Sequence, residues 1–273
     1  MAFMGRACVL WVLLGMLAAC GGGGGSSPAP PTAGPPAAST AFEIASAEAG
    51  ITYGVQVWLP AGYEAAGAPL PAVYAMDSEY RFATLTAVLQ ATGRRAILVN
   101  VAAMSSARRY VDFTMPGAEA YYRFLTRELI PFVEARWRID GAKRTLSGHS
   151  LSGQFALYAL YLERPDARFF SSFVSGDGSF WYTPDGRYVP ALEDPVRMEQ
   201  AMRDRSRQLP VSLVIAGNGA PGNGPQGAQL HDFLAQRGYE GLRLANLNYN
   251  SGHVAMDGPS FGDALDFIYG PAR

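Results

Sequence analysis

The segment Leu146-Ser147-Gly148-His149-Ser150-Leu151-Ser152-Gly153 places a serine between an apolar run and a segment of helical periodicity. A serine on a sharp strand-to-helix turn can act as a nucleophile, and the turn needs small residues two positions before and two positions after it. Gly148 and Ser152 meet this requirement around Ser150. For the rival Ser152, the second flanking residue is Gln154, which is too large. The pattern therefore predicts Ser150 as the nucleophile.

A serine hydroxyl is a weak nucleophile at neutral pH and needs an adjacent base. The sequence contains three histidines, His149, His231 and His253. We expect His149 to point away from the reacting side of the turn, and His231 to lie on a helix surface. His253 lies in a loop after the last apolar run, where a base follows the nucleophile in chain order. We therefore expect His253 to be the general base and acid.

The group that orients the imidazole is left open, because residues 217–224, after the apolar run 211–216, hold no carboxylate. The site would be a Ser–His dyad whose imidazole is held by a backbone carbonyl or by Asn218. Alternatively, Asp177 supplies the acid from one strand earlier, or Asp257 folds back from four residues past His253. Of these interpretations the dyad or Asn218-assisted site is preferred, Asp177 as the acid comes second, and Asp257 comes last. A buried acid can contribute about 10⁴ in rate, so the choice concerns speed and not reaction type.

The developing negative charge on an ester oxygen requires two backbone N–H donors. One donor is expected from Leu151, directly after the nucleophile. The other is expected from the loop Asp77-Ser78-Glu79-Tyr80, which follows the apolar run 70–76. Asp77 itself is expected to be a structural turn residue, because it precedes the nucleophile in the chain.

A sheet must bring these residues together. Short apolar runs alternate with segments of helical periodicity. The runs cover 51–59, 70–76, 96–101, 144–146, 169–174, 211–216 and 242–247, and the helical segments cover 121–133, 151–162 and 261–268. Pro131 should kink or break the first helix near its end. The alternation predicts a single α/β domain with a mostly parallel central sheet and helices on both faces.

The N-terminal residues predict export. Arg6 precedes the apolar run 7–17, which is too short to span a bilayer, and Leu17-Ala18-Ala19-Cys20 resembles the lipobox of bacterial lipoproteins. We expect a lipoprotein signal peptide over 1–19, a lipidated Cys20 with a Gly/Pro-rich disordered tether over 20–41, and the α/β domain over 42–273. The expected location is the bacterial cell envelope, at the periplasmic face or the outer membrane, with the lipid as the membrane contact.

The charge and cysteine content limit the classes of binding partner and cofactor that the sequence predicts. The 273 residues include 22 Lys and Arg against 23 Asp and Glu, without a basic block, so nucleic-acid binding is not expected. Cys8 would leave with the signal peptide and Cys20 would carry lipid, so the mature domain would have no cysteine metal site. No metal or cofactor is expected.

Taken together, these residues resemble the serine esterase family of the α/β-hydrolase superfamily, which includes enterochelin esterases, esterase D and the mycolyltransferases. Met76-Asp77-Ser78 is similar to the family's Leu-Asp-Gly, residues 109–114 to its Arg-x-x-Asp-aromatic-Thr segment, and Phe180-Trp181 to an aromatic pair lining the site. The resemblance implies an α/β-hydrolase fold and, from the mycolyltransferases, Glu79 as the second N–H donor. The enterochelin-esterase branch, which is the most similar, includes Ser–His members without a conventional acid.

This chain also departs from the family pattern. Ser78 and Ser152 each replace a glycine, and Asp177 with Gly178 stands inside the usual Ser-Pro-Ser turn. These departures leave the subfamily, and therefore the substrate, open.

The sequence therefore indicates a serine carboxylic-ester hydrolase that acts on small-molecule esters through an acyl-enzyme outside the cytoplasm. A siderophore ester or lactone is one candidate substrate, and Arg109, Phe180 and Trp181 would give its rings a cationic, aromatic rim. Two alternatives remain open, namely acyl transfer to a sugar or lipid acceptor, and a non-catalytic binding lipoprotein with the same fold. The sequence does not give the oligomeric state.

Overall fold

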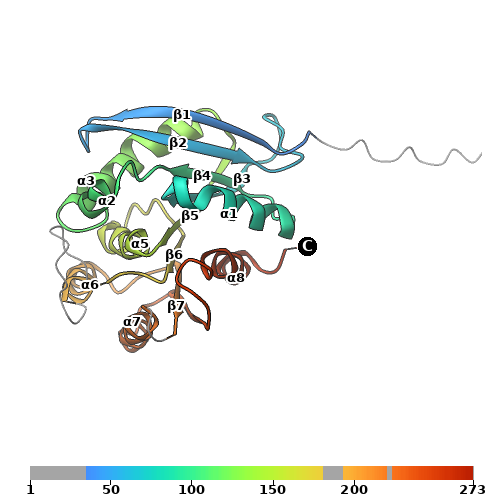
Figure 1. The fold of residues 1–273 in the computed structure, drawn as a ribbon. Helices are drawn as coiled ribbons and strands as arrows, with labels where there is room; N and C mark the ends of the chain where they lie inside the picture. The colour runs from blue at the N-terminus through green and yellow to red at the C-terminus, as the bar shows by residue number, and fades with distance from the viewer. Residues whose placement is uncertain (1–34, 181–192, 220–222, 273) are drawn as a thin grey trace, which may run out of the picture. The chain divides into compact units, whose positions relative to one another are not determined.

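The structure, a computed structural model, describes residues 35–180, 193–219 and 223–272. In these residues eight strands form one sheet in the order β1-β2-β4-β3-β5-β6-β7-β8 (Figure 1). The strands are β1 (Ala38–Ser46), β2 (Ile51–Leu59), β3 (Leu70–Met76), β4 (Ile97–Val101), β5 (Ile139–His149), β6 (Ser172–Gly176), β7 (Ser212–Asn218) and β8 (Arg243–Tyr249). β1 and β2 are antiparallel to their neighbours and all other pairings are parallel, which confirms the mostly parallel sheet.

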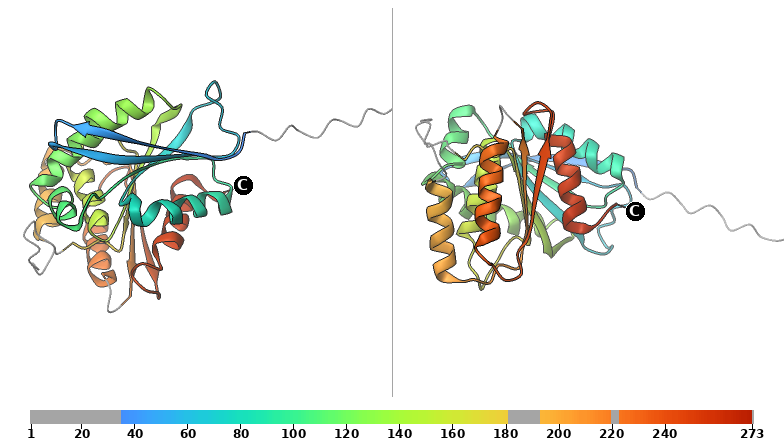
Figure 2. Two further views of the ribbon diagram at one scale, coloured as in Figure 1. Left: turned by 45° about the horizontal axis from the view of Figure 1, so that its top comes forward. Right: turned by 90° about the horizontal axis from the view of Figure 1, so that it is seen from below.

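Helices cover both faces of the sheet, as expected. They are α1 (Ser78–Thr92), α2 (Ser106–Asp112), α3 (Gly117–Arg123), the π-helical segment η1 (Phe124–Leu129), α4 (Ile130–Glu134), α5 (Leu151–Leu162), α6 (Glu193–Arg205), α7 (Gly224–Gln236) and α8 (Asp257–Tyr269). α1 and α8 pack against each other on one face, while α5, α6 and α7 lie on the other (Figure 2).

The innermost elements are the ones that position the predicted site. Every residue of β4, β6 and β7 is buried, which suits strands that helices cover on both faces. α5 is buried at every residue from Leu151 to Tyr161, so it is a core helix. The turn between β5 and α5 is therefore fixed by packing on both sides.

Two boundaries differ from the sequence prediction. β1 begins at Ala38, inside the segment 20–41 that was expected to be a tether, so the end of that segment belongs to the sheet. The reason is backbone pairing with β2, from Ala38 opposite Leu59 onward, which does not depend on apolar side chains. β5 runs from Ile139 to His149 and is longer than the predicted 144–146. None of the helices in the described ranges is long and apolar enough to cross a membrane.

The helix predicted over 121–133 is broken, as Pro131 indicated. α3 passes into the π-helical η1, and Pro131 is the second residue of α4. Proline lacks an N–H group, and its ring clashes with the carbonyl four residues earlier in a regular helix. The regular α-helical hydrogen bonding is interrupted by the π-helical segment directly ahead of Pro131.

Candidate active site

Ser150 occupies the strand-to-helix turn that the sequence predicted. It lies between β5 and α5 with φ 59° and ψ −123°, a conformation that L-residues rarely adopt. A Cβ atom on Gly148 would lie 1.9 Å from the carbonyl oxygen of Ser152, so only glycine fits there. The Ser150 N–H donates to the Gly176 carbonyl at 2.8 Å, which ties the turn to the end of β6. The turn therefore holds Ser150 at the carboxyl edge of the sheet.

We expect Gly148→Ala to lower the free energy of unfolding by at least about 2 kcal/mol, because the added methyl group overlaps backbone that cannot move away. Chemical denaturation of both proteins measures the difference. Gly252→Ala is the matched control, since a Cβ at Gly252, in the His253 loop, would meet no atom of the described residues within 4 Å. Equal losses in both variants would contradict the steric argument.

His253 lies in the loop between β8 and α8 and has a carboxylate partner. Its Nδ1 atom is 2.5 Å from Oδ2 of Asp177, whose side chain is fully buried directly after β6. The other oxygen, Oδ1, accepts a hydrogen bond from the Asn218 N–H at 2.9 Å. The preference for an acid-free dyad was therefore wrong, because parallel β6 and β7 end at the same edge and Asp177 reaches the His253 loop from one strand earlier.

The other two candidate partners of the imidazole have different contacts. The Asn218 side chain accepts from the Ser251 N–H at 3.4 Å, so it holds the His253 loop, and among the described residues it makes no hydrogen bond to the ring. Asp257 is bonded through both oxygens to Arg81, at 2.9 Å each, and Arg81 also donates to the Ser147 carbonyl at 3.0 Å. Burial raises the pKa of Asp257, but the charge and hydrogen bonds of Arg81 outweigh it, so the pKa lies below its ordinary value.

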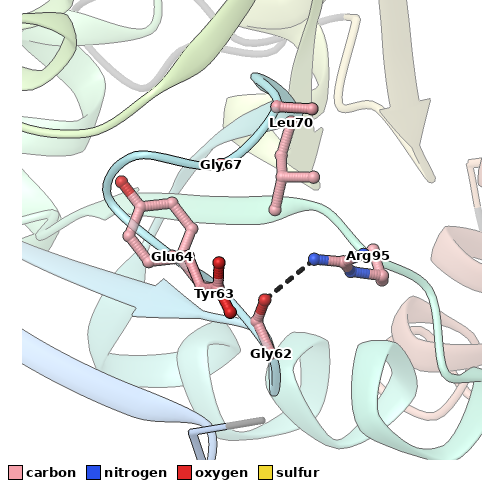
Figure 3. Close-up of a pocket in the computed structure, with 7 residues that line it drawn as sticks. Gly62, Tyr63, Glu64, Gly67, Leu70 and Arg95 are labelled. Atoms are coloured by element: carbon pink, nitrogen blue, oxygen red, sulfur yellow. Dashed lines mark hydrogen bonds between the residues drawn. The ribbon is translucent and has the colours of Figure 1, made fainter.

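Ser150 and His253 line one pocket of about 480 Å³. The Ser150 hydroxyl is 3.3 Å from the hydroxyl of Ser179, and within the described residues it makes no hydrogen bond to His253. Such catalytic hydrogen bonds are often long before substrate binds. A second cavity, beside the β2–β3 loop where Arg95 donates to the Gly62 carbonyl, contains no serine or histidine in its lining (Figure 3). The nucleophile and base thus share the first pocket.

His149 does not point away from the site, so that prediction was wrong. Its ring lies with its centroid 4.7 Å from that of His253, and it lines the same pocket. Within the described residues, neither ring nitrogen of His149 has a hydrogen-bond partner. Burial lowers the pKa of His149 to about 4 against the opposing charge of Asp257, whose Oδ1 is 3.6 Å from Nδ1, and the charges of Arg81 and His253 lower it further. The His149 ring is therefore neutral at pH 7, and it lines the pocket beside His253.

The buried His149 should make the fold sensitive to acid. Its pKa is about 4 in the folded protein against 6.5 in the unfolded chain, so the unfolded chain binds more protons between these values. As the pH falls from 6.5 to 4, we expect the wild type to lose up to about 3 kcal/mol relative to His149→Gln. Denaturant titrations of both proteins across this range measure the difference.

Comparing the two proteins also removes an opposing contribution. Burial raises the pKa of Glu163 to about 7, so its contribution to the stability of the fold decreases as the pH rises from 4.5 to 7. Glu163 is present in both proteins, so this contribution cancels in the comparison. A difference between the two proteins that does not depend on pH would contradict the assignment to His149.

The two predicted N–H donors lie at the start of helices. Leu151 is the first residue of α5, and Glu79 is the second residue of α1. The first N–H groups of a helix have no partner within it, and the helix dipole favours negative charge there. The Glu79 carboxylate accepts from the N–H groups of Ala103 and Met104, at 2.9 and 3.0 Å, which fixes the loop after β4 to α1.

The predicted substrate rim is only partly present. Arg109 lines the pocket, but its guanidinium is bonded to Asp77 and is therefore not a free cation. Phe180 is 3% exposed and belongs to the main hydrophobic core, so its placement in the rim was wrong. The Phe180 ring lies against Gly178, where an added Cβ atom would come within 2.6 Å of it. Trp181 and Cys20 lie outside the described residues.

Ser179 and Asn223 belong to the site although the sequence did not single them out. The Ser179 N–H donates to the Ser150 carbonyl at 3.0 Å, and the Asn223 amide donates to the Asp177 carbonyl at 2.6 Å. Asn223 lies in the segment 217–224, which holds no carboxylate, and its amide side chain is the sequence signal that could have identified it. Among the described residues, no cluster of three His, Cys, Asp or Glu side chains could hold a metal ion.

A serine on a strained turn, with a His–Asp pair at the same edge of a mostly parallel sheet, defines the arrangement of an α/β-class serine hydrolase. Residues 46–254 match the profile of the Esterase family ("Putative esterase"). The chain is 32% identical over 250 residues to the ferri-bacillibactin esterase BesA of Bacillus subtilis (strain 168), covering 78% of this chain and 81% of the relative. The chain belongs to the Esterase family.

Solved structures agree with this fold. The BES protein from Bacillus cereus is similar with a TM-score of 0.69 and 22% identity, over 84% of this chain and 95% of that one. The siderophore hydrolase EstA from Aspergillus nidulans is similar with a TM-score of 0.71 and 20% identity, over 84% and 93% of the two chains. The predicted α/β-hydrolase fold is confirmed.

Proposed function

We propose that this chain hydrolyses carboxylic esters through an acyl-enzyme, with Ser150 as nucleophile, His253 as general base and acid, and Asp177 as the group that orients the imidazole. The observation that carries the proposal is the shared pocket, which the strained Ser150 and His253 both line, together with the contact between Nδ1 of His253 and the buried Asp177 carboxylate. A carboxylate at Nδ1 fixes the tautomer that leaves Nε2 free to accept a proton.

The chemistry would run in two halves. The Ser150 oxygen attacks the ester carbonyl while its proton moves to Nε2 of His253, and the carbonyl electron pair becomes an oxyanion. The N–H groups of Leu151 and Glu79, at the first turns of two helices, would hold that charge. Collapse expels the alcohol with the proton from His253, and water then repeats the sequence on the acyl-serine to release the acid.

We propose a siderophore-type ester as the substrate. The relative named as a ferri-bacillibactin esterase supports this substrate class. The pocket is also suited to rings, because Tyr80 and Val254 line it while being 70% and 80% exposed. Its charged residues Arg109 and Arg81 are each paired with an aspartate, so the wall offers little net charge to a small anion.

We also propose that the enzyme acts in the bacterial cell envelope, anchored through lipid on Cys20. The support is the sequence Leu17-Ala18-Ala19-Cys20 after a short apolar run. Metabolic labelling with a fatty-acid probe tests this in a bacterial host: the wild type should incorporate the probe and Cys20→Ser should not. Equal labelling of both proteins would contradict the anchor.

Purified protein should hydrolyse both p-nitrophenyl acetate and ferri-bacillibactin. The kcat/KM should be at least about 100-fold higher for the siderophore, since a larger ester offers binding energy that the small p-nitrophenyl acetate lacks. Product analysis by mass spectrometry should show the free acid, with or without added sugar acceptors. If the protein hydrolyses p-nitrophenyl acetate but not ferri-bacillibactin, only the proposed substrate class is refuted. Failure with every ester, and no labelling by a fluorophosphonate, would refute the enzyme.

A further inference from the structure

Asp77 has an unusual conformation for the residue that precedes the first turn of a helix. It lies at the N-cap of α1 in the left-handed conformation, with φ 64° and ψ 48°, and its side chain makes no capping hydrogen bond. An N-cap aspartate normally has an extended backbone and accepts from the N–H groups of its own helix. Here the carboxylate is turned away from them, although it is only 2% exposed.

Two side chains from other elements hold that carboxylate. Arg109 of α2 donates through Nε and Nη2 to its two oxygens, at 2.8 and 3.0 Å. Ser152 of α5 donates its hydroxyl to Oδ2 at 2.7 Å. A left-handed aspartate is unfavourable by about 1–2 kcal/mol, so it persists only where neighbouring groups maintain it.

Ser152 also joins this carboxylate to the turn that carries the nucleophile. Its oxygen accepts from the His149 N–H at 2.9 Å, directly before Ser150, and its side chain is fully buried. A hydrogen-bonded chain thus runs from Arg109 through Asp77 and Ser152 to the backbone at His149. The serine that departs from the strict G-x-S-x-G pattern therefore links the starts of α1 and α5.

We propose that Ser152 and Arg109 are positioning residues for the oxyanion hole. Through Asp77 they fix the first turn of α1 relative to α5, and they keep the Asp77 carboxylate off the α1 N–H groups that face the pocket. Glu79 and Leu151 can then donate to one oxygen from two separate helices. This inference rests on the proposed function, and it assigns Arg109 a structural link to Asp77 in place of a contact with substrate.

Ser152→Ala is the sharpest test, because Ser152 is fully buried and is not part of the pocket lining. We expect kcat/KM for p-nitrophenyl acetate to fall about 10- to 100-fold, as for a misplaced oxyanion donor. The Ki of a trifluoromethyl ketone should rise by the same factor. In its adduct the Ser150 oxygen bonds to the carbonyl carbon, the serine proton passes to His253, and the former carbonyl oxygen becomes the oxyanion.

Arg109→Lys should lower kcat in the same way, and the double variant should lose little more than either single variant, because both act through Asp77. Arg108→Lys is the matched control: Arg108 is the adjacent residue of α2 and is also paired with an aspartate, Asp112, which does not reach the turn. The control should keep its kcat even if its thermal unfolding midpoint falls.

An active wild type with Ser152→Ala within 2-fold in both kcat/KM and Ki would overturn the inference and leave the esterase proposal intact. Arg109→Lys that raises KM at unchanged kcat would return Arg109 to substrate binding. A wild type that neither turns over esters nor reacts with the ketone would refute the proposed function, and this inference with it.

Discussion

Replacing Ser150 with alanine should lower kcat for any ester substrate by at least about 10⁴-fold and abolish labelling by a fluorophosphonate. Without the hydroxyl no acyl-enzyme can form, and only the charge stabilisation of the oxyanion hole remains. Folding should be almost unaffected, because alanine satisfies the small space of the turn. Steady-state kinetics and intact-protein mass spectrometry measure the two effects.

Ser152→Ala provides the comparison that distinguishes the two serines of the turn. It should keep fluorophosphonate labelling, at a reduced rate, since the buried Ser152 hydroxyl donates to Asp77 and does not face the pocket. Labelling that survives in Ser150→Ala and disappears in Ser152→Ala would reverse the assignment of the nucleophile.

Asp177→Asn should lower kcat by about 10⁴-fold. Asparagine can still accept from the Asn218 N–H through its oxygen, so the site should keep its geometry. Its amide nitrogen would then face Nδ1 of His253, which favours the tautomer with the proton on Nε2, where it cannot accept the serine proton. Steady-state kcat, with circular dichroism to check the fold, measures the effect.

Asn218→Ala is the control for an amide-assisted site. It removes the side-chain contact to the Ser251 N–H but keeps the backbone N–H that reaches Asp177, so we expect less than about a 10-fold loss of kcat. A loss confined to Asn218→Ala, with Asp177→Asn near wild-type activity, would restore the acid-free site that the sequence favoured.

The spacing of residues along the chain was sufficient to predict the parts of the site that lie in one continuous segment. The turn at Ser150 requires small neighbours, and Gly148 shows why, since a Cβ there would overlap the backbone at Ser152. His253 could be placed because chain order puts it after the last strand. The alternation of strands and helices likewise predicted the sheet, apart from β1, whose pairing depends on backbone hydrogen bonds.

Contacts between distant segments could not be derived from spacing. Asp177 was one candidate among several, because no local pattern shows that the end of β6 reaches the loop after β8, a contact 76 residues apart in sequence. The orientation of His149 depends on where α8 and the His253 loop pack. Arg109 and Phe180 are residue types found in binding rims, and only the structure shows that one is paired with Asp77 and the other is in the core.

The ion pair between Arg81 and Asp257 joins the second turn of α1 to the first residue of α8, across 176 positions of the chain. α8 is also the segment that follows the His253 loop directly. Removing the whole of α8, Asp257 included, would therefore leave a buried guanidinium without its partner and free the loop that carries the base. C-terminal truncations of this enzyme should lose activity and solubility together once the cut removes α8, whereas fusion partners are better joined beyond it.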